Sequence, residues 1–314
     1  MSESTREHNP AQQRFLQLLG KSDVRQSIPE GLDDELRSEL ETAVAPFMSV
    51  LPDGKSYENR LFLNKQGLSN VLSCEAYFLD GQEEFEWSVP KARGSVVHKA
   101  IEISIHLRHP MAPADIVEEA ISRLSNDLGK GLADFLVSLD ETDRALLVGQ
   151  CASSFARFGE LVPPIKKSWT PGVESAVTLN LCGNRIRVSG KVDLALGRPP
   201  DKVIIDVKTG TPFGAHRDDL RLYALLDLLA VGVAPRKVAS LYLDSGEVHA
   251  EDVTESLLRA AARRLADGLT RTIELKYAKA EPARRPGNNC RWCTLRDSCA
   301  AGQAHLAARE QDDW

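Results

Sequence analysis

The sequence lacks any apolar run long enough to span a bilayer, which takes about 20 consecutive apolar residues. Its opening segment, residues 1–10, has no apolar core of the kind that a secretory signal peptide requires. It also contains no internal repeat and no low-complexity tract. We therefore expect a cytoplasmic globular protein with no membrane association, and its 314 residues are enough to bury a full core.

The sequence also lacks an overall excess of positive charge. Its net charge of −6 argues against a general polyanion binder. The charge is uneven, however, because residues 1–50 carry nine acidic and five basic side chains, whereas residues 256–299 carry ten basic and four acidic ones. The C-terminal region is therefore expected to meet phosphates, although a solvated helix face accounts for part of its excess.

Hydrophobic periodicity divides the chain into a helical first half and a mixed second half. Predicted helices cover residues 67–78 (with Ser69 as N-cap), 94–106, 113–160, 215–231 and 254–272, and predicted strands cover 173–181, 185–196, 202–207 and 238–243. This order predicts an α/β fold with a mixed central sheet flanked by helices. We expect a helical N-terminal extension of unknown role (residues 1–60), a main domain (61–302) with a helical insertion (about 113–160), and a tail (303–314).

Two strand-length apolar runs each end in an acidic residue. Asp193 closes Gly-Lys-Val-Asp, and Asp206 and Lys208 stand in Ile-Ile-Asp-Val-Lys-Thr-Gly, after a proline-containing turn. Alternation along a strand places Asp206 and Lys208 on one face, and the turn can bring Asp193 beside them. The two carboxylates and the carbonyl of Val207 can hold Mg²⁺, while Lys208 can orient a water or neutralise charge on a phosphate. This pattern favours phosphodiester hydrolysis, although acidic residues also end strands without any catalytic role.

Three of the six cysteines cluster near the C-terminus. Cys290, Cys293 and Cys299 form Cys-x2-Cys-x5-Cys, one ligand short of a tetrahedral metal site. Reduced thiols this close together would be prone to oxidation unless a metal held them. The spacing alone leaves both zinc and an iron–sulfur cluster open.

The acidic motif resembles the core motif of the PD-(D/E)XK nuclease superfamily, and in particular its RecB-type branch. The shared pattern is Gly190-x-x-Asp193 followed by Asp206-x-Lys208-Thr-Gly. The resemblance covers about residues 60–302 and implies a restriction-endonuclease-like core. It also implies that Asp193, Asp206 and Lys208 are catalytic.

The same resemblance implies roles for residues outside this motif. His98, in Gly-Ser-Val-Val-His, stands where the family has a metal-binding histidine, and a structural histidine is the alternative. Glu174 stands where a glutamate often assists the metal, and an exposed strand-end glutamate is the alternative. Tyr223 fits the family's Gln-x-x-x-Tyr helix, but Asp219 replaces the glutamine, which bears on how the substrate is held.

The cysteines extend the resemblance to relatives with a four-iron, four-sulfur cluster, such as AddB subunits and CRISPR-associated Cas-type exonucleases. These proteins have one cysteine far upstream of the nuclease core and three after it. Cys74, which ends Gly-Leu-Ser-Asn-Val-Leu-Ser-Cys, matches the upstream position. The resemblance thus implies a cluster on Cys74, Cys290, Cys293 and Cys299, with zinc less favoured.

Taken together, the resemblance implies a Mg²⁺- or Mn²⁺-dependent DNA nuclease. The expected activity is exonucleolytic, on single-stranded or end-processed DNA, in repair, recombination or defence. The sequence contains no Gly-x4-Gly-Lys-Ser/Thr motif, so a helicase partner would be a separate chain. The alternative from another functional class is a DNA-binding subunit of a helicase–nuclease complex that has lost the chemistry.

Overall fold

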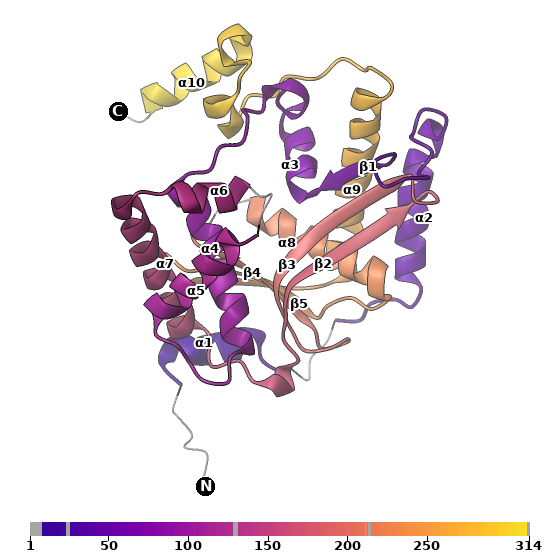
Figure 1. Cartoon of the computed structure of the whole chain (residues 1–314). Coiled ribbons are helices and arrows are strands. Elements are labelled where there is room, and N and C mark those ends of the chain that lie inside the picture. Colours follow the sequence, from indigo (N-terminus) through magenta and orange to yellow (C-terminus); the bar gives the residue numbers. More distant parts are fainter. Residues whose placement is uncertain (1–7, 23–25, 128–130, 211, 213–214, 313–314) are drawn as a thin grey trace.

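The computed structural model describes residues 8–22, 26–127, 131–210, 212 and 215–312. The helices are α1 (Pro10–Leu19), α2 (Leu32–Val44), α3 (Lys65–Ser73), α4 (Val89–His106), α5 (Pro113–Ser125), α6 (Gly131–Ser138), α7 (Glu141–Leu161), α8 (Ala215–Val231), α9 (Glu255–Lys276) and α10 (Ala300–Asp312). The strands are β1 (Leu61–Asn64), β2 (Gly172–Leu181), β3 (Ile186–Leu196), β4 (Val203–Lys208), β5 (Lys237–Tyr242) and β6 (Glu247–Asp252). Helices α4–α7 lie to one side of the sheet and α2, α8 and α9 to the other (Figure 1).

The six strands form one mixed sheet in the order β1-β3-β4-β5-β6, with β2 paired to β3. Strands β2, β3 and β4 form an antiparallel meander, while β4 and β5 are parallel and are connected by α8. This confirms the predicted fold class, a mixed central sheet flanked by helices, and it is consistent with a restriction-endonuclease-like core.

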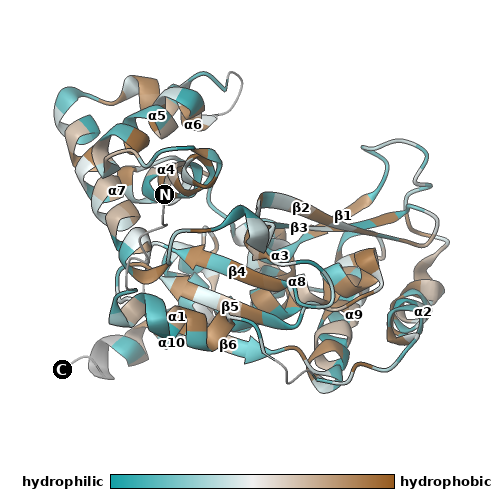
Figure 2. Ribbon diagram, turned by 90° about the horizontal axis from the view of Figure 1, so that it is seen from below, coloured by the Kyte–Doolittle hydropathy of each residue, from teal (hydrophilic) through white to brown (hydrophobic). Residues whose placement is uncertain are grey.

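Both faces of the sheet are covered, which explains the continuous apolar run in β4. Ile204 packs into a core that α2, α8 and α9 share with one face of the sheet. The next residue, Ile205, packs into a second core that α1, α4, α5 and α7 share with the other face. Strands buried on both faces carry apolar residues without alternation. In Figure 2 the central strand β4 is accordingly hydrophobic and the edge strand β6 hydrophilic.

The first 60 residues contribute to both cores. The leucines of α2 are buried against α8 and α9, and Phe15 and Leu19 of α1 belong to the core around α4 and α7. The predicted insertion, residues 113–160, consists of α5, α6 and α7. Among the described helices, none is long and apolar enough to cross a membrane.

Three details differ from the prediction. The helix predicted over residues 67–78 is α3, which begins at Lys65 because the side chain of Asn64, and not that of Ser69, caps it by accepting a hydrogen bond from the amide of Gly67 at 2.8 Å. The α-helix ends at Ser73, and a separate π-helical turn covers Tyr77–Gly81. Strand β1 was not predicted, because its four residues are too few to show a period. Strand β6 was not predicted either, because it is exposed along most of its length and lacks an apolar face.

Candidate active site

The candidate site lies where one edge of β3 has no neighbouring strand. One edge of β3 pairs with β2, from Ile186 to Ala195. Along the other edge, pairing among the described strands runs to Ser189 with β1 and resumes at Leu194 with β4. Residues Gly190–Asp193 therefore lie between the end of β1 and the start of the β3–β4 ladder.

Gly190 allows a buried aromatic ring to enter this gap. A Cβ atom at Gly190 would lie 2.4 Å from Cε1 and 2.9 Å from Cδ1 of Tyr223 on α8. The ring of Tyr223 is 2% exposed. The glycine of the Gly-x-x-Asp motif is therefore required by close approach of the tyrosine and needs no special backbone conformation.

Asp193 and Val207 show how the two strands separate. The amide of Val207 donates a hydrogen bond to Oδ2 of Asp193 at 2.8 Å. A side chain thus replaces the next main-chain bond of the β3–β4 ladder. The carboxylate of Asp193 lies on the face of the sheet that α4 covers, near His98 of that helix.

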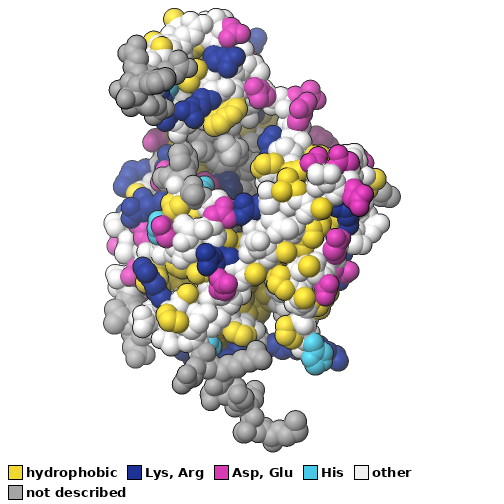
Figure 3. Space-filling view, turned by 90° about the vertical axis from the view of Figure 1, so that its left-hand side faces the viewer, with side chains coloured by type: hydrophobic (Ala, Val, Ile, Leu, Met, Phe, Trp, Pro, Cys, Tyr) yellow, Lys and Arg dark blue, Asp and Glu magenta, His cyan; other side chains and the backbone are white. Residues whose placement is uncertain are grey.

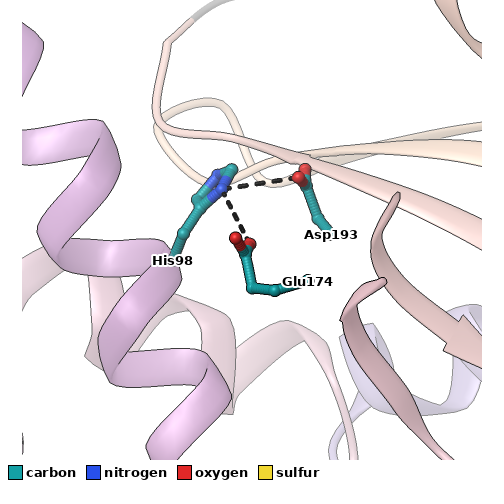
Figure 4. Close-up of side chains that lie close together, drawn as sticks. All are labelled: His98, Glu174 and Asp193. Atoms are coloured by element: carbon teal, nitrogen blue, oxygen red, sulfur yellow. Dashed lines mark ion pairs between the residues drawn. The ribbon is translucent and has the colours of Figure 1, made fainter. Parts of the chain in front are cut away.

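His98, Glu174 and Asp193 converge from a helix and two neighbouring strands (Figure 4). Nδ1 of His98 lies 3.6 Å from Oε1 of Glu174 and 3.5 Å from Oδ1 of Asp193. Nε2 of His98 lies 2.8 Å from the carbonyl oxygen of Val207. Because a carbonyl only accepts, Nε2–H donates to it, and Nδ1 is directed at the two carboxylates.

Glu174 reaches this position from an unusual backbone conformation. It has a φ of +49°. The register places it opposite Asp193, between the pairs Val173–Leu194 and Ser175–Val192. A left-handed conformation is costly for a residue with a side chain, and such strain concentrates at functional sites. Glu174 also forms an ion pair with Lys191.

The three groups shift one another's pKa values. Burial acts to lower the pKa of His98, but contacts with Glu174 and Asp193 outweigh it, so the pKa is raised. Burial acts to raise the pKa of Glu174, but hydrogen bonds to His98 and Lys191 lower it to about 2. Burial raises the pKa of Asp193 to about 6, and the charge of His98 opposes this while that of Asp206 adds to it. Carboxylates crowded in this way favour a bound cation.

Asp206 and Lys208 belong to β4, the strand whose pairing with β3 begins beyond the gap. Asp206 is 1% exposed, and Nζ of Lys208 lies 3.0 Å from its Oδ1 and 2.7 Å from its Oδ2. Even so, Oδ2 accepts no hydrogen bond of good geometry from the described residues. A buried carboxylate oxygen left in this state is a suitable ligand for a cation.

A second lysine, Lys65, faces the same carboxylate and was missed by the sequence reasoning. It is the first residue of α3, and its Nζ lies 3.8 Å from Oδ1 of Asp206 and 3.4 Å from Oδ2 of Asp219. Its Nζ also lies 5.4 Å from the centroid of the Tyr223 ring. The only sequence signal was its place directly after β1, which was itself too short to predict.

The residues present fit a hard divalent cation. An imidazole nitrogen and two carboxylates, from His98, Glu174 and Asp193, lie within 4.8 Å of one another. This donor set suits Mg²⁺ or Mn²⁺. Among the expected ligands, Asp206 pairs with lysines, and the carbonyl of Val207 accepts a hydrogen bond from His98.

The cysteines predicted to share a cluster also lie together. Cys74, Cys290, Cys293 and Cys299 line one cavity, between the end of α3 and the segment before α10. The two segments are joined by a hydrogen bond from the amide of Thr294 to the carbonyl of Gly81 at 3.0 Å.

Two glycines lie beside the sulfur atoms, and at Gly81 a side chain would collide with one of them. A Cβ at Gly81 would lie 2.8 Å from Sγ of Cys293, and one at Gly302 would lie 3.5 Å from Sγ of both Cys290 and Cys299. Burial raises the pKa of Cys293, and the neighbouring thiols add to this. The remaining cysteines lie elsewhere, Cys151 inside α7 and Cys182 after β2.

Comparisons with known proteins bear on this geometry. A family model described as the PD-(D/E)XK nuclease superfamily matches residues 68–300. A solved structure from Eubacterium rectale, named "Putative exonuclease", is similar with 17% identity and a TM-score of 0.49, over 79% of this chain and 92% of that chain. A structure named SSO0001 is similar with 13% identity and a TM-score of 0.28, over 66% of this chain and 95% of that chain. No curated protein matches the chain.

Proposed function

Because this chain belongs to the PD-(D/E)XK nuclease superfamily, we propose that it is a Mg²⁺- or Mn²⁺-dependent deoxyribonuclease. We propose an exonuclease that acts on single-stranded or end-processed DNA. The observation that carries the proposal is the meeting of five groups at the open edge of β3. These groups are His98, Glu174, Asp193, Asp206 and Lys208.

In this proposal His98, Glu174 and Asp193 hold the metal, and Asp206 completes the site or holds Lys208. A bound divalent ion would supply an activated water and stabilise negative charge on the phosphate. The hydrogen bond from His98 Nε2–H to the Val207 carbonyl keeps Nδ1 available to the metal. Lys208 orients the attacking water or neutralises charge that develops on the phosphate.

Tyr223 and Asp219 support the site from α8. Tyr223 is buried and fills the gap beside Gly190. Asp219 lies one turn before it and pairs with Lys65. We assign both residues a positioning role.

We further propose that Cys74, Cys290, Cys293 and Cys299 bind a four-iron, four-sulfur cluster, as in the RecB-type relatives that carry one. Zinc bound by thiolates at about 2.3 Å brings sulfur atoms to within about 3.8 Å of one another. Among the described residues, no three of these sulfur atoms lie within 4.8 Å of one another. Three of the sulfur atoms are thus not gathered as closely as tetrahedral zinc coordination requires. Anaerobic purification followed by iron and zinc analysis tests this, and a colourless protein with stoichiometric zinc would refute it.

The activity is tested with end-labelled single- and double-stranded DNA in the presence of Mg²⁺ or Mn²⁺. Lys208→Ala should abolish cutting while sparing DNA binding, because the lysine acts on the reacting phosphate. Lys202→Ala is the matched control, since Lys202 also pairs with a buried aspartate, Asp227, near the opposite end of β4. Cutting by Lys208→Ala at the wild-type rate would sink the catalytic assignment. Binding without cutting by the wild-type protein would favour a DNA-binding subunit, which a separate helicase chain would accompany.

A further inference from the structure

Lys208 of the candidate active site lines a surface cavity of about 680 Å³. Lys65, Arg264 and Arg285 line the same cavity. Each of these four cations lies within 4 Å of a carboxylate, and the four carboxylates are those of Asp206, Asp219, Asp218 and Glu75. Elsewhere, on the face drawn in Figure 3, basic and acidic side chains are interspersed. The cavity therefore brings four cationic side chains together beside the candidate active site.

Lys65 and Lys208 face Asp206 within 4 Å, but they differ in their other contacts. Nζ of Lys208 lies 2.7 Å from Asp206. Nζ of Lys65 is more distant from Asp206, at 3.8 Å, and lies closer to Asp219, at 3.4 Å. Neither distance for Lys65 is that of a short charge-assisted hydrogen bond, which measures about 2.7–2.9 Å. Its side chain is 30% exposed, toward the cavity.

We propose that Lys65 binds a backbone phosphate of the nucleic acid, next to the reacting phosphate on which Lys208 acts during hydrolysis, and that Asp219 holds the ammonium in place until the strand arrives. The proposal rests on the proposed nuclease function, because it takes a nucleic-acid strand as the occupant of the site. The bound phosphate displaces Asp219 as the partner of Lys65. The strand then continues along the cavity toward Arg264 and Arg285.

This arrangement predicts opposite effects for the two partners of one ion pair. Lys65→Met removes a phosphate contact and should weaken strand binding by about tenfold at low salt, the magnitude of a hydrogen bond to a charged group. Asp219→Asn removes a competing anion and should strengthen binding a few-fold. If the pair served only to stabilise the fold, both substitutions would act in the same direction. Lys65→Arg keeps the charge and should retain most of the affinity.

The test measures binding of fluorescein-labelled oligothymidylate by anisotropy in EDTA, over a range of KCl concentrations. Each lost contact with a single-stranded phosphate lowers the slope of log K against log[salt] by about 0.7. We expect that decrease for Lys65→Met and no change for Lys65→Arg. Lys202→Met is the control, since it breaks a lysine–aspartate pair that also involves α8, and neither Lys202 nor Asp227 lines the cavity. Thermal melts show which variants are folded.

Two results would overturn the proposal. One is a wild-type slope and affinity in Lys65→Met, and the other is a loss of affinity in Asp219→Asn equal to that in Lys65→Met. Because the assay contains no divalent ion, it does not depend on cutting. A protein that binds DNA through Lys65 but fails to cut it would contradict the nuclease proposal alone.

Discussion

Gly190→Ala should destabilise the protein through a single defined contact. The added methyl group would lie 2.4 Å from Cε1 of Tyr223. Carbon atoms in contact are about 3.5–4.0 Å apart, so the ring or the strand must move by roughly 1 Å. Tyr223 is almost fully buried and packs within the core of α8 and the sheet, so the ring has little room to give way.

The cost follows from what overpacking does elsewhere. Forcing an extra carbon into a packed core costs typically about 1–3 kcal/mol. In a chain of this size that corresponds to a decrease in Tm of roughly 2–10 °C. We expect activity to fall as well, because the displaced ring lies beside Lys65.

Urea unfolding of a double-mutant cycle isolates the contact. Adding Gly190→Ala to Tyr223→Ala should cost close to nothing, because the ring is gone, so the coupling free energy should be about 1–3 kcal/mol. Gly172→Ala in β2 is the control, since its Cβ would first meet Oγ of Ser175 at 3.3 Å, the end of a small side chain that can rotate. An equal cost of Gly190→Ala in both backgrounds would refute the reasoning.

Two further predictions concern regions away from the catalytic groups. Glu251 pairs with Arg217 and Arg221; burial opposes this, but the arginines prevail and lower its pKa to about 2. The ionised carboxylate of Glu251 thus stabilises the folded protein fully above pH 4.5, the ordinary pKa of the group, and this stabilisation is lost as the pH falls toward 2. Urea unfolding at pH 7 and pH 3 should show Glu251→Gln less stable than wild type by about 1 kcal/mol at pH 7 and by less than half of that at pH 3, and an equal difference at both pH values would contradict this. Cys74→Ser should lower the iron content of anaerobically purified protein and its Tm, whereas Cys182→Ser should change neither; full iron loading of Cys74→Ser would exclude Cys74 as a ligand.

The secondary structure of the second half of the chain could be predicted from the sequence more accurately than that of the first half. The run Val203–Lys208 and helix Ala215–Val231 were predicted almost to the residue, because strands buried on both faces and long apolar helices carry strong patterns. Strands β1 and β6 were missed because one is short and the other exposed. Their pairing is decided by tertiary contacts, which local periodicity does not record.

Some residues of the candidate site could be predicted from the sequence, and others could not. The motif itself indicates Asp193, Asp206 and Lys208, whereas the proximity of Cys74 to the C-terminal cysteines was expected only from the resemblance. Nothing in the sequence indicated Lys65, because its approach to Asp206 depends on where β1 ends beside β3. The left-handed backbone of Glu174 is likewise a property of the folded sheet.

The most direct test of the central claim is the rate at which end-labelled DNA is degraded as Mn²⁺ or Mg²⁺ is titrated into the wild type and Asp193→Asn. Asp193 contacts both His98 and the amide of Val207, so the account predicts metal-dependent cutting by the wild type. It predicts at least a hundredfold loss in the variant, or a matching rise in the metal concentration required, because one charged ligand is missing. Cutting without added metal in the presence of EDTA, or an unchanged metal titration in Asp193→Asn, would contradict it.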